Sequence, residues 1–362
     1  MVNKNLSFSN ILIRVPNWLG DSMMATPVVS VVHKAFPKAK LTILAKSNFA
    51  SFWKNFSEVH EVLVLEKGVA GYLKTISEIK KRQFDVALTL PSSFSSAFLH
   101  FAADIPVRIG WSGEGRDIFL TQVVPAPEPR KKHLVWEYLE LILQGLGRPI
   151  PFPTFKLAFP LDLKISQEAE KLLKSLKVNV KPGLVALGPG ATYGPAKRWP
   201  LVNWKELITQ MLESGKETLL VVGGAEEKEY LSDLWSDLPE KHSKRLMSLV
   251  GKTDPRVLAA VLDECKLLIT NDTGPMHVAA AVGTPTVAVF GSTSPAWTRP
   301  FGLGHEVIYK NAECSPCFQK TCPIGYICLN QITVDEVLRT AKKKLKGRRV
   351  VAGEKPPQGV LV

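Results

Sequence analysis

The chain has 362 residues, 45% of them hydrophobic and 22% charged, which is an ordinary globular composition and enough for about two domains. Apolar runs stay well short of the roughly 18 residues that span a bilayer, and the N-terminus lacks a signal-peptide layout, so we expect a cytoplasmic protein. The net charge of +13 favours an acidic partner. Because no nucleic-acid-binding motif accompanies the charge, we expect a phosphorylated substrate or an anionic lipid and no nucleic acid.

The first half of the chain alternates short apolar runs with amphipathic segments. Strands are predicted at 10–15, 41–45, 62–65 and 84–90. Helices are predicted at 72–82 and 133–146, and the segment 16–36 is expected to begin as a loop and to continue as a helix. Strands that alternate with helices indicate βαβ units and a parallel sheet.

The pattern restarts after a segment with four prolines, residues 148–160, which is typical of a linker. Strands are predicted at 183–187, 217–222, 266–270 and 284–290, with helices at 166–176, 202–213, 255–263 and 275–282. We therefore expect an α/β protein with two Rossmann-like domains that face each other across a cleft. The predicted boundaries are 1–155 and 156–332, followed by a helix at 333–346 and a flexible basic tail at 347–362.

A polar turn follows the predicted strand 266–270. Asp272, Thr273 and Gly274 stand between the carboxyl end of that strand and the amino end of the next helix. Free backbone N–H groups and the positive helix end make such a turn a good anion site. His277 lies one turn into the helix, where it can face the same ligand. The alternative is that Asp272 or Thr273 only caps the helix.

A second polar loop follows the first strand of the second half. Gly188 and Gly190 leave its backbone open, Thr192 and Tyr193 offer hydroxyls, and Lys197 offers a positive charge. A loop of this kind can bind a pyrophosphate through N–H, hydroxyl and ammonium donors. The alternative is a surface turn with solvated cations. The loop contains neither a Walker A motif nor GxGxxG, which disfavours dinucleotide binding of the dehydrogenase type.

Three carboxylates are candidates for binding or catalysis. Glu226 and Glu227 come just past a predicted strand end, where a carboxylate can accept hydrogen bonds from ribose hydroxyls. They could instead favour a helix N-terminus. Asp21 follows Gly20 at the start of a predicted helix, where it could take a proton from an attacking hydroxyl or could simply cap the helix.

Four segments together resemble the ADP-heptose–lipopolysaccharide heptosyltransferases, most closely the heptosyltransferase II branch of that family. They are RVPNWLGDSMMATP at 14–27, GPGATYGPAKRWP at 188–200, NDTGPMHVAAAVGTPTVAVFGSTSP at 271–295 and CSPCFQKTCPIGYICL at 314–329. The resemblance implies a GT-B fold and a glycosyltransferase. It further implies inverting, metal-independent transfer of heptose from ADP-L-glycero-D-manno-heptose to heptose I of the phosphorylated lipopolysaccharide inner core.

The resemblance also implies roles for particular residues. The family's catalytic carboxylate falls on Asp21. Its diphosphate-binding positions fall on Thr192, Lys197 and the turn 272–274, and its ribose-binding acid falls on Glu227 or Glu226. Arg14 and Asn17, in the first matching segment, are expected to contact the acceptor.

Other functions remain open at this point. The chain could transfer heptose to Kdo-lipid A, or it could bind a nucleotide sugar without catalysis. A nucleotide-sugar epimerase is disfavoured by the RVPNWLGD segment, which resembles the heptosyltransferases specifically. Because the implied acceptor is a membrane lipid, we expect a peripheral protein at the inner face of the cytoplasmic membrane. The basic run Lys342–Arg349 could attract it there, or could be merely solvated.

Four of the five cysteines cluster near the C-terminus. Cys314, Cys317, Cys322 and Cys328 are candidate ligands of a structural zinc ion away from the chemistry, because disulfides are disfavoured in a reducing cytoplasm. The alternative is a loop of reduced cysteines that pack as small hydrophobic residues. Cys265 is expected in the core. No cofactor is expected to be required for catalysis.

Overall fold

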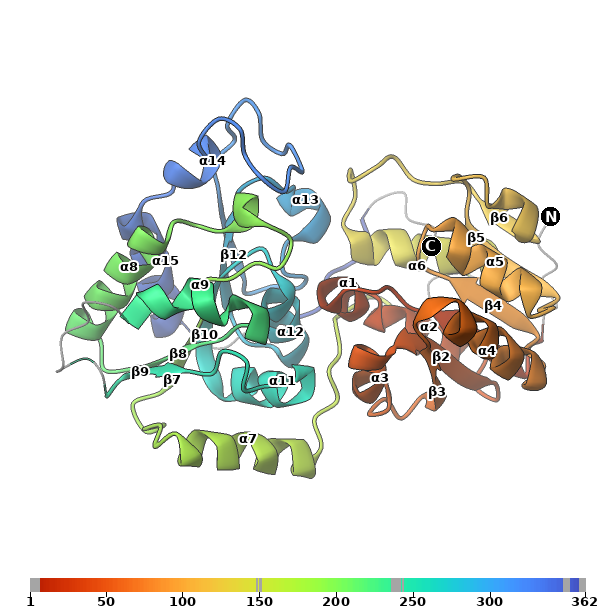
Figure 1. Cartoon of the computed structure of the whole chain (residues 1–362), viewed down its shortest axis with the longest axis horizontal. Coiled ribbons are helices and arrows are strands. Elements are labelled where there is room, and N and C mark those ends of the chain that lie inside the picture. The colour runs from red at the N-terminus through yellow and green to blue at the C-terminus, as the bar shows by residue number, and fades with distance from the viewer. Residues whose placement is uncertain are drawn as a thin grey trace. The chain divides into compact units, whose positions relative to one another are not determined.

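The computed structural model describes residues 7–147, 149, 152–235, 242, 244–347 and 352–357. The chain forms two compact units. The first extends to Pro160 and resumes at Glu354, and the second runs from Leu161 to Gly353 (Figure 1). The boundary lies close to the predicted one, within the proline-rich segment. No helix in the described ranges is long and apolar enough to cross a membrane.

The first unit is built on a parallel sheet of six strands in the order β3-β2-β1-β4-β5-β6. This is the Rossmann order, in which the direction of winding reverses between the first and fourth strands. The central strands are buried on both faces, as their continuous apolar runs predict. The strands are β1 (Asn10–Arg14), β2 (Lys40–Lys46), β3 (Val59–Leu65), β4 (Val86–Thr89), β5 (Val107–Trp111) and β6 (Gln122–Val124).

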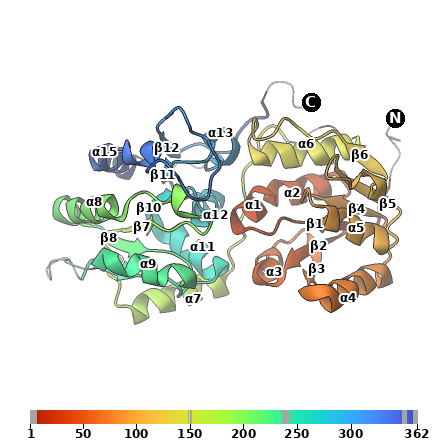
Figure 2. The same ribbon diagram turned by 45° about the horizontal axis from the view of Figure 1, so that its top comes forward.

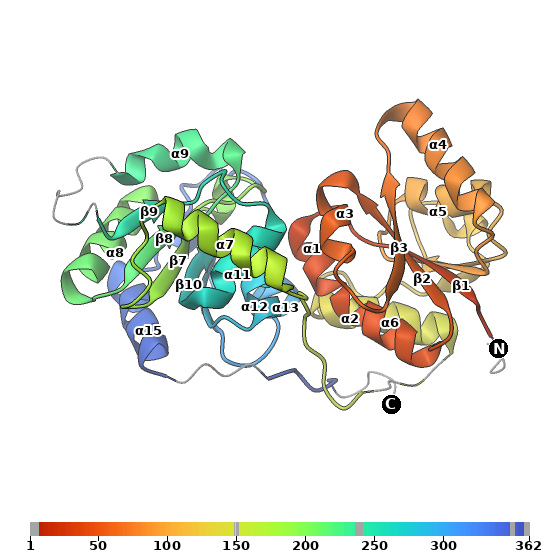
Figure 3. The same ribbon diagram turned by 90° about the horizontal axis from the view of Figure 1, so that it is seen from below.

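Helices cover both faces of this sheet (Figures 2 and 3). The helices α2 and α6 pack together on one face, where α3 also lies, and α4 and α5 cover the other. A core cluster that includes Leu12, Ile79 and Leu99 joins the sheet to α4 and α5. The helices are α1 (Leu19–Met24), α2 (Thr26–Ala35), α3 (Ser47–Trp53), α4 (Gly68–Lys81), α5 (Phe94–Ala102), η1 (Asp117–Phe119) and α6 (Leu134–Leu146).

The second unit repeats the same topology. Its parallel six-stranded sheet has the order β12-β11-β10-β7-β8-β9, which is again the Rossmann order when its strands are counted from β7. The winding reverses between β7 and β10. The strands are β7 (Leu184–Gly188), β8 (Thr218–Val221), β9 (Leu246–Ser248), β10 (Cys265–Asn271), β11 (Thr286–Phe290) and β12 (Glu306–Tyr309).

Alternate residues of β11 show how the helices cover this second sheet. Val287 and Val289 pack in one core with Trp204 of α8 and Val337 of α15, whereas Ala288 packs on the opposite face with Met276 of α12. The helices are α7 (Leu163–Ser175), η2 (Pro195–Lys197), α8 (Leu201–Ser214), η3 (Ala225–Glu227), α9 (Lys228–Ser232), η4 (Asp233–Trp235), α11 (Pro255–Glu264), α12 (Gly274–Val282), α13 (Pro295–Thr298), α14 (Ile327–Asn330) and α15 (Val334–Lys346).

The structure differs from the sequence-based expectations in several places. The strands β5, β6, β9 and β12 were not predicted. The segment after Gly20 forms two helices, α1 and α2, and Asp21 lies within the first of them. Part of the tail that was predicted to be flexible is ordered, because Ala352 forms a bridge with Leu303 and Glu354 forms one with Phe155. Arg348 and Arg349 of the predicted basic run lie outside the described residues.

Candidate active site

The two polar loops of the second unit meet at its topological switch point. β7 and β10 are neighbours, and Gly188 is in register with Thr270, so the segments that follow these strands emerge side by side. Asn271 joins them: its amide nitrogen donates to the carbonyls of Pro189 and Gly190 at 2.7 and 3.2 Å, and its amide oxygen accepts from the N–H of Trp199 at 3.1 Å. This residue was not singled out from sequence, yet it clamps the two loops together.

A buried ion pair connects the two loops. The Lys197 ammonium lies 2.6 Å from Oδ2 of Asp272, and the Thr293 hydroxyl donates to the same oxygen at 2.6 Å. Asp272 is buried and Lys197 is mostly buried. The predicted residues Lys197 and Asp272 therefore do meet. The carboxylate holds the ammonium at the switch point, and Thr293, which follows β11, is a third member that sequence analysis missed.

The start of α12 lies at the same edge. Thr273 is its N-cap residue and makes no side-chain cap hydrogen bond, and the Asp272 carboxylate is bonded to Lys197 and Thr293 instead. The alternative that Asp272 or Thr273 serves only as a side-chain cap is therefore wrong. Gly274 is the first helical residue. The N–H of Asp272 donates to the Val289 carbonyl at 3.2 Å, so the N–H groups of Thr273 and Gly274 are the donors that the turn offers to an anion. His277 is buried within the helix, and Gly283 ends the helix with a φ of 80° that favours glycine.

Tyr193 lies beside Lys197 at this edge of the sheet. Its hydroxyl donates to the carbonyl of Phe318 at 2.6 Å. The ammonium of Lys197 lies 4.9 Å from the centre of its ring, and that of Lys320 lies 6.0 Å from it. Thr192 lies beside it in the same loop and is exposed. The site thus presents two cations and a hydroxyl-bearing ring to a bound anion.

The two candidate ribose acids differ in their surroundings. Glu226 is exposed, whereas Glu227 is buried, and its Oε2 accepts from the N–H of Gly224 at 2.9 Å. Burial raises the pKa of Glu227, and nearby Glu226 raises it further. Its Oε1 makes no regular hydrogen bond within the described residues and lies where a Cβ on Gly190 would come within 2.1 Å. Gly190 is therefore needed to make room for this carboxylate.

In the first unit, the predicted acceptor residues lie at the end of β1. Arg14 is buried, and its guanidinium donates to the side-chain oxygen of Asn17 at 2.5 Å and to the carbonyl of Leu44 at 3.4 Å. Burial lowers the pKa of Arg14 to about 10, and Tyr72 partly offsets this. Asn17 is partly exposed. Arg14 therefore orients Asn17, and Asn17 is the member of the pair that a ligand can reach.

Asp21 is the third residue of α1, in its first turn, and Trp18 holds the N-cap position of that helix. The carboxylate is partly exposed. Burial raises the pKa of Tyr138 in α6 well above its usual value, and the negative charge of Asp21 raises it further. Asp21 thus lies near a buried, protonated phenol of its own unit, which sequence analysis missed.

Arg116 is a further polar residue that the sequence did not reveal. Its side chain is fully buried, and Nη1 donates to the carbonyl of Pro91 at 2.9 Å. Nε and Nη2 have no hydrogen-bond partner within the described residues. Pro91 follows β4 at the switch point of the first unit. These two guanidinium nitrogens could donate hydrogen bonds to an anionic or hydroxyl-rich ligand at that edge.

The four-cysteine segment lies against the loop that contains Thr192 and Lys197. The Lys320 carbonyl accepts from the N–H of Ala196 at 3.0 Å, and the Phe318 N–H donates to the Ser292 carbonyl at 2.7 Å. The segment therefore lies beside the predicted donor loop, although the zinc ion was expected away from the chemistry. As they lie, the thiols do not form a ready metal site, because the described ranges contain no group of three or more His, Cys, Asp or Glu that could hold an ion. The expected core position of Cys265 is confirmed.

Comparisons with known proteins agree with this architecture. The family model described as "Glycosyltransferase family 9 (heptosyltransferase)" matches residues 72–327. Lipopolysaccharide heptosyltransferase 2 of Escherichia coli K12 is 30% identical over 82% of this chain and 87% of its own. Lipopolysaccharide heptosyltransferase 1 of Pseudomonas aeruginosa is 34% identical over 84% of each chain. The solved structure of E. coli ADP-heptose lps heptosyltransferase II has a TM-score of 0.79 at 26% identity, covering 93% of this chain and 98% of that one.

Two Rossmann-like units with polar loops at their switch points, on a backbone that follows a solved heptosyltransferase, define a glycosyltransferase with the GT-B fold. The chain belongs to glycosyltransferase family 9 (heptosyltransferase). The resemblance to the heptosyltransferase II branch, inferred from four sequence motifs, is confirmed by these relatives.

Proposed function

We propose that the protein transfers heptose from ADP-L-glycero-D-manno-heptose to heptose I of the phosphorylated lipopolysaccharide inner core. The relatives named heptosyltransferase 2 and II support this donor and acceptor. The structural observation that carries the donor part is the buried Lys197–Asp272 ion pair beside the uncapped start of α12. It places a cation and free backbone donors at one switch point, the arrangement that a nucleoside diphosphate requires.

In the proposed donor complex, the diphosphate lies against the start of α12 and the Lys197 ammonium. Thr192 supplies a hydroxyl, the ring of Tyr193 lies beside the Lys197 ammonium, and the backbone at Thr273 and Gly274 supplies N–H donors. Asp272 does not contact the phosphates, because two negative groups would repel each other. It holds Lys197 in place, with help from Thr293. As ADP departs, these donors stabilise the charge that develops on the leaving phosphate.

For the ribose we propose Glu227 rather than Glu226, because Glu227 is fixed between the two loops by the Gly224 N–H and the nearby Ala191 N–H. We expect donor affinity to fall as the pH is lowered through the raised pKa of Glu227, since a protonated carboxyl accepts ribose hydroxyls poorly. ADP affinity measured by calorimetry at several pH values should show this loss above the usual titration range of a glutamate. Glu227→Gln should bind more weakly and lose that dependence, whereas Glu226→Gln should retain it.

For the acceptor we propose that Asn17, oriented by Arg14, contacts the sugar and that Asp21 takes the proton from its attacking hydroxyl. The hydroxyl oxygen bonds to the anomeric carbon of heptose while the bond from that carbon to the ADP oxygen breaks. Attack opposite the leaving group inverts the anomeric configuration. The negative charge of Asp21 helps to keep the buried phenol of Tyr138 protonated.

One assay tests the proposal directly. The protein is incubated with ADP-heptose and either a heptose-I-terminated core acceptor or Kdo-lipid A, and products are analysed by mass spectrometry. We expect a mass gain of one heptose on the first acceptor. Gain only on Kdo-lipid A would assign the other transfer step. ADP binding with no gain on either acceptor would indicate a nucleotide-sugar-binding protein.

We also propose that the four-cysteine segment takes up a structural zinc ion after a local rearrangement of the thiols. Burial raises the pKa of Cys328, and the other three cysteines raise it further. The four sulfurs are therefore close enough for their thiolates to repel one another, and a bound cation would relieve this repulsion. Tetrahedral zinc is the ion that four thiolates favour.

Elemental analysis checks this proposal. Protein purified without chelator should contain close to one zinc per chain, and Cys314→Ser, at an exposed position, should lower that content. Because the segment contacts the loop at Ala196, removal of zinc should also weaken ADP binding. A metal-free protein with four freely titrating thiols would instead identify the cysteines as reduced packing residues.

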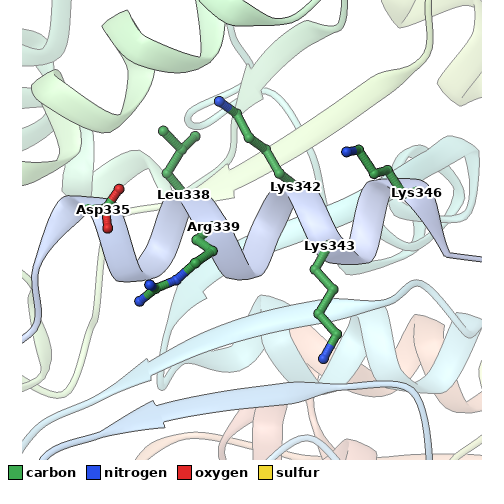
Figure 4. A pocket seen from close by; sticks show the side chains of 6 residues that line it. All are labelled: Asp335, Leu338, Arg339, Lys342, Lys343 and Lys346. Atoms are coloured by element: carbon green, nitrogen blue, oxygen red, sulfur yellow. The ribbon is translucent and has the colours of Figure 1, made fainter.

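We propose further that the protein works at the inner face of the cytoplasmic membrane, held there reversibly by charge. Helix α15 carries a basic surface formed by Arg339, Lys342, Lys343 and Lys346, with Asp335 and Leu338 beside them (Figure 4). All of these side chains come from one helix, on turns spaced three or four residues apart. The opposite side of the helix, including Val337 and Ala341, is buried. The basic residues therefore point outward, where they can attract anionic lipid.

Sedimentation with anionic vesicles tests this attraction. Because screening limits it to about 8 Å at physiological salt, binding should weaken as salt is raised. Truncation after Leu345 should reduce the low-salt binding, but it also removes the bridges made by Ala352 and Glu354. A variant with Lys342, Lys343 and Lys346 changed to glutamine keeps those bridges, and it should bind less while ADP affinity is unchanged. Equal binding to neutral and anionic vesicles would show that this charge is only solvated surface.

A further inference from the structure

An exposed cluster of apolar side chains covers part of the first unit. It comprises Phe94, Phe98 and Phe101 of α5 together with Ile118 and Phe119 of η1, and is called the aromatic patch below. The three α5 rings are 48%, 37% and 45% exposed, and Ile118 is 77% exposed. Helix α5 presents these rings on its outer side, while Ala97 and Leu99 face the core.

The rings of the aromatic patch touch one another. Phe119 lies at the centre, with ring centroids 5.0, 5.4 and 5.3 Å from those of Phe94, Phe98 and Phe101. The rings therefore form a pre-assembled surface and would lose little side-chain freedom on binding. A contiguous apolar surface of this kind marks an interaction site, whereas singly scattered apolar residues do not.

The aromatic patch adjoins the proposed acceptor edge. Helix α5 begins a few residues after β4, at the switch point of the first unit. Arg116, which bonds the Pro91 carbonyl at that edge, directly precedes η1. The hydroxyl of Tyr72 in α4 donates to the carbonyl of Ser95 in α5, and α4 lies beside α5 in both Figures 1 and 3. The patch is thus continuous with the surface that would meet the acceptor.

Charge around the aromatic patch is favourable for an anionic surface. Residues 66–82, which include α4, contain five basic and two acidic residues. The Arg108 guanidinium lies 5.5 Å from the centre of the Phe101 ring. Charges of both signs are partly paired here: Asp104 pairs with Lys80, and Asp117 accepts from the N–H of Gly113 at 2.8 Å, while Lys67 and the exposed Glu114 have no ion pair among the described residues. Helix α4 adds two exposed apolar residues, Val69 and Leu73.

We propose that the aromatic patch inserts into the headgroup region of the anionic bilayer that holds the lipid acceptor. Aromatic rings bordered by basic residues suit the interface between water and hydrocarbon. This inference rests on the proposed function, since a lipid-anchored acceptor must be met at a membrane surface. It adds a contact that salt does not screen, in contrast to the basic surface of α15.

Vesicle binding in high salt tests the inference, because the electrostatic contribution is then suppressed. Lipid vesicles containing phosphatidylglycerol are sedimented with the full-length protein and its variants. The double variant Phe94→Ser/Phe98→Ser should bind roughly tenfold less strongly, since two apolar rings no longer leave water. Leu163→Ser on α7, where the side chain is 75% exposed, is the matched control and should bind as the unchanged protein does.

A variant expected to bind vesicles more tightly distinguishes a lost membrane contact from a loss of folding. Ile118→Trp replaces an exposed side chain, so it should fold normally and bind vesicles several-fold more tightly. Unchanged binding of both the double variant and Ile118→Trp would overturn the inference. So would concentration-dependent dimers that the double variant abolishes, because the patch would then bind a second copy of the chain.

Transfer to a water-soluble, delipidated acceptor separates this inference from the proposed function. The double variant should retain normal turnover on that acceptor and lose activity only on acceptor embedded in vesicles. Absence of transfer by the unchanged protein to either acceptor would contradict the proposed function. Normal transfer by the double variant to embedded acceptor would contradict the membrane contact alone.

Discussion

Asp21→Asn should lower turnover by roughly 10² to 10⁴ while donor affinity barely changes. The substitution keeps the shape of the side chain and removes its basicity, so the attacking hydroxyl must lose its proton without a positioned base. The position of Asp21 in the first turn of α1, beside the buried phenol of Tyr138, supports this role. Steady-state kinetics with a soluble acceptor gives turnover, and calorimetry with ADP gives donor affinity.

Glu114→Gln is a suitable control, because Glu114 is an exposed carboxylate of the same unit. It should leave turnover unchanged. If Asp21→Asn turned over at a near-normal rate, Asp21 would not be the base. If it lost donor affinity as well as turnover, its effect would be structural, and a shifted melting temperature would reveal this.

Lys197→Ala should weaken ADP binding by about one to two orders of magnitude, since a charge-assisted contact of this kind contributes roughly 1.5 to 3 kcal/mol. The ion pair between Lys197 and Asp272 increases the expected loss of ADP affinity. Without Lys197, the buried carboxylate of Asp272 keeps only the Thr293 hydroxyl and repels the incoming diphosphate. Calorimetry with ADP measures the loss, and Lys252→Ala, at an exposed lysine of the same unit, is the control.

A double variant separates the two effects. Lys197→Ala/Asp272→Asn removes both charges, so it should bind ADP more tightly than Lys197→Ala alone. Additive losses would mean that Asp272 contacts the donor independently. Unchanged ADP affinity in Lys197→Ala would remove this lysine from the donor site.

Much of the fold follows from local sequence pattern. The buried central strands β1, β7 and β10 were predicted within one or two residues, because their apolar runs are continuous and end at turn residues. The short strands β6 and β9 were not predicted, since three residues carry too little pattern. Both strands lie at sheet edges, and each forms because it pairs with the strand beside it.

The candidate site was likewise predicted only in part from the sequence. Loop chemistry and family motifs pointed to Lys197, Asp272 and the turn at Thr273, because polar residues after parallel strands gather at one sheet edge. They did not reveal that Lys197 and Asp272 pair with each other, since the residues are 75 positions apart and only the β7–β10 register brings them together. The choice of Glu227 over Glu226 likewise depends on the burial of Glu227 against Gly190. Two adjacent glutamates look alike in the sequence, so the sequence cannot show which of them is buried.

The sequence by itself determined the two Rossmann-like halves, the family and the chemical character of each loop, because these depend on local periodicity and on residue type. Only the tertiary structure decided which polar groups are satisfied and which remain available. Thr293 joins Lys197 and Asp272, the guanidinium of Arg116 is buried with two nitrogens that have no hydrogen-bond partner among the described residues, and the cysteine segment lies against the loop at Ala196. Each of these depends on contacts between distant segments, and such contacts leave no periodic trace in the chain.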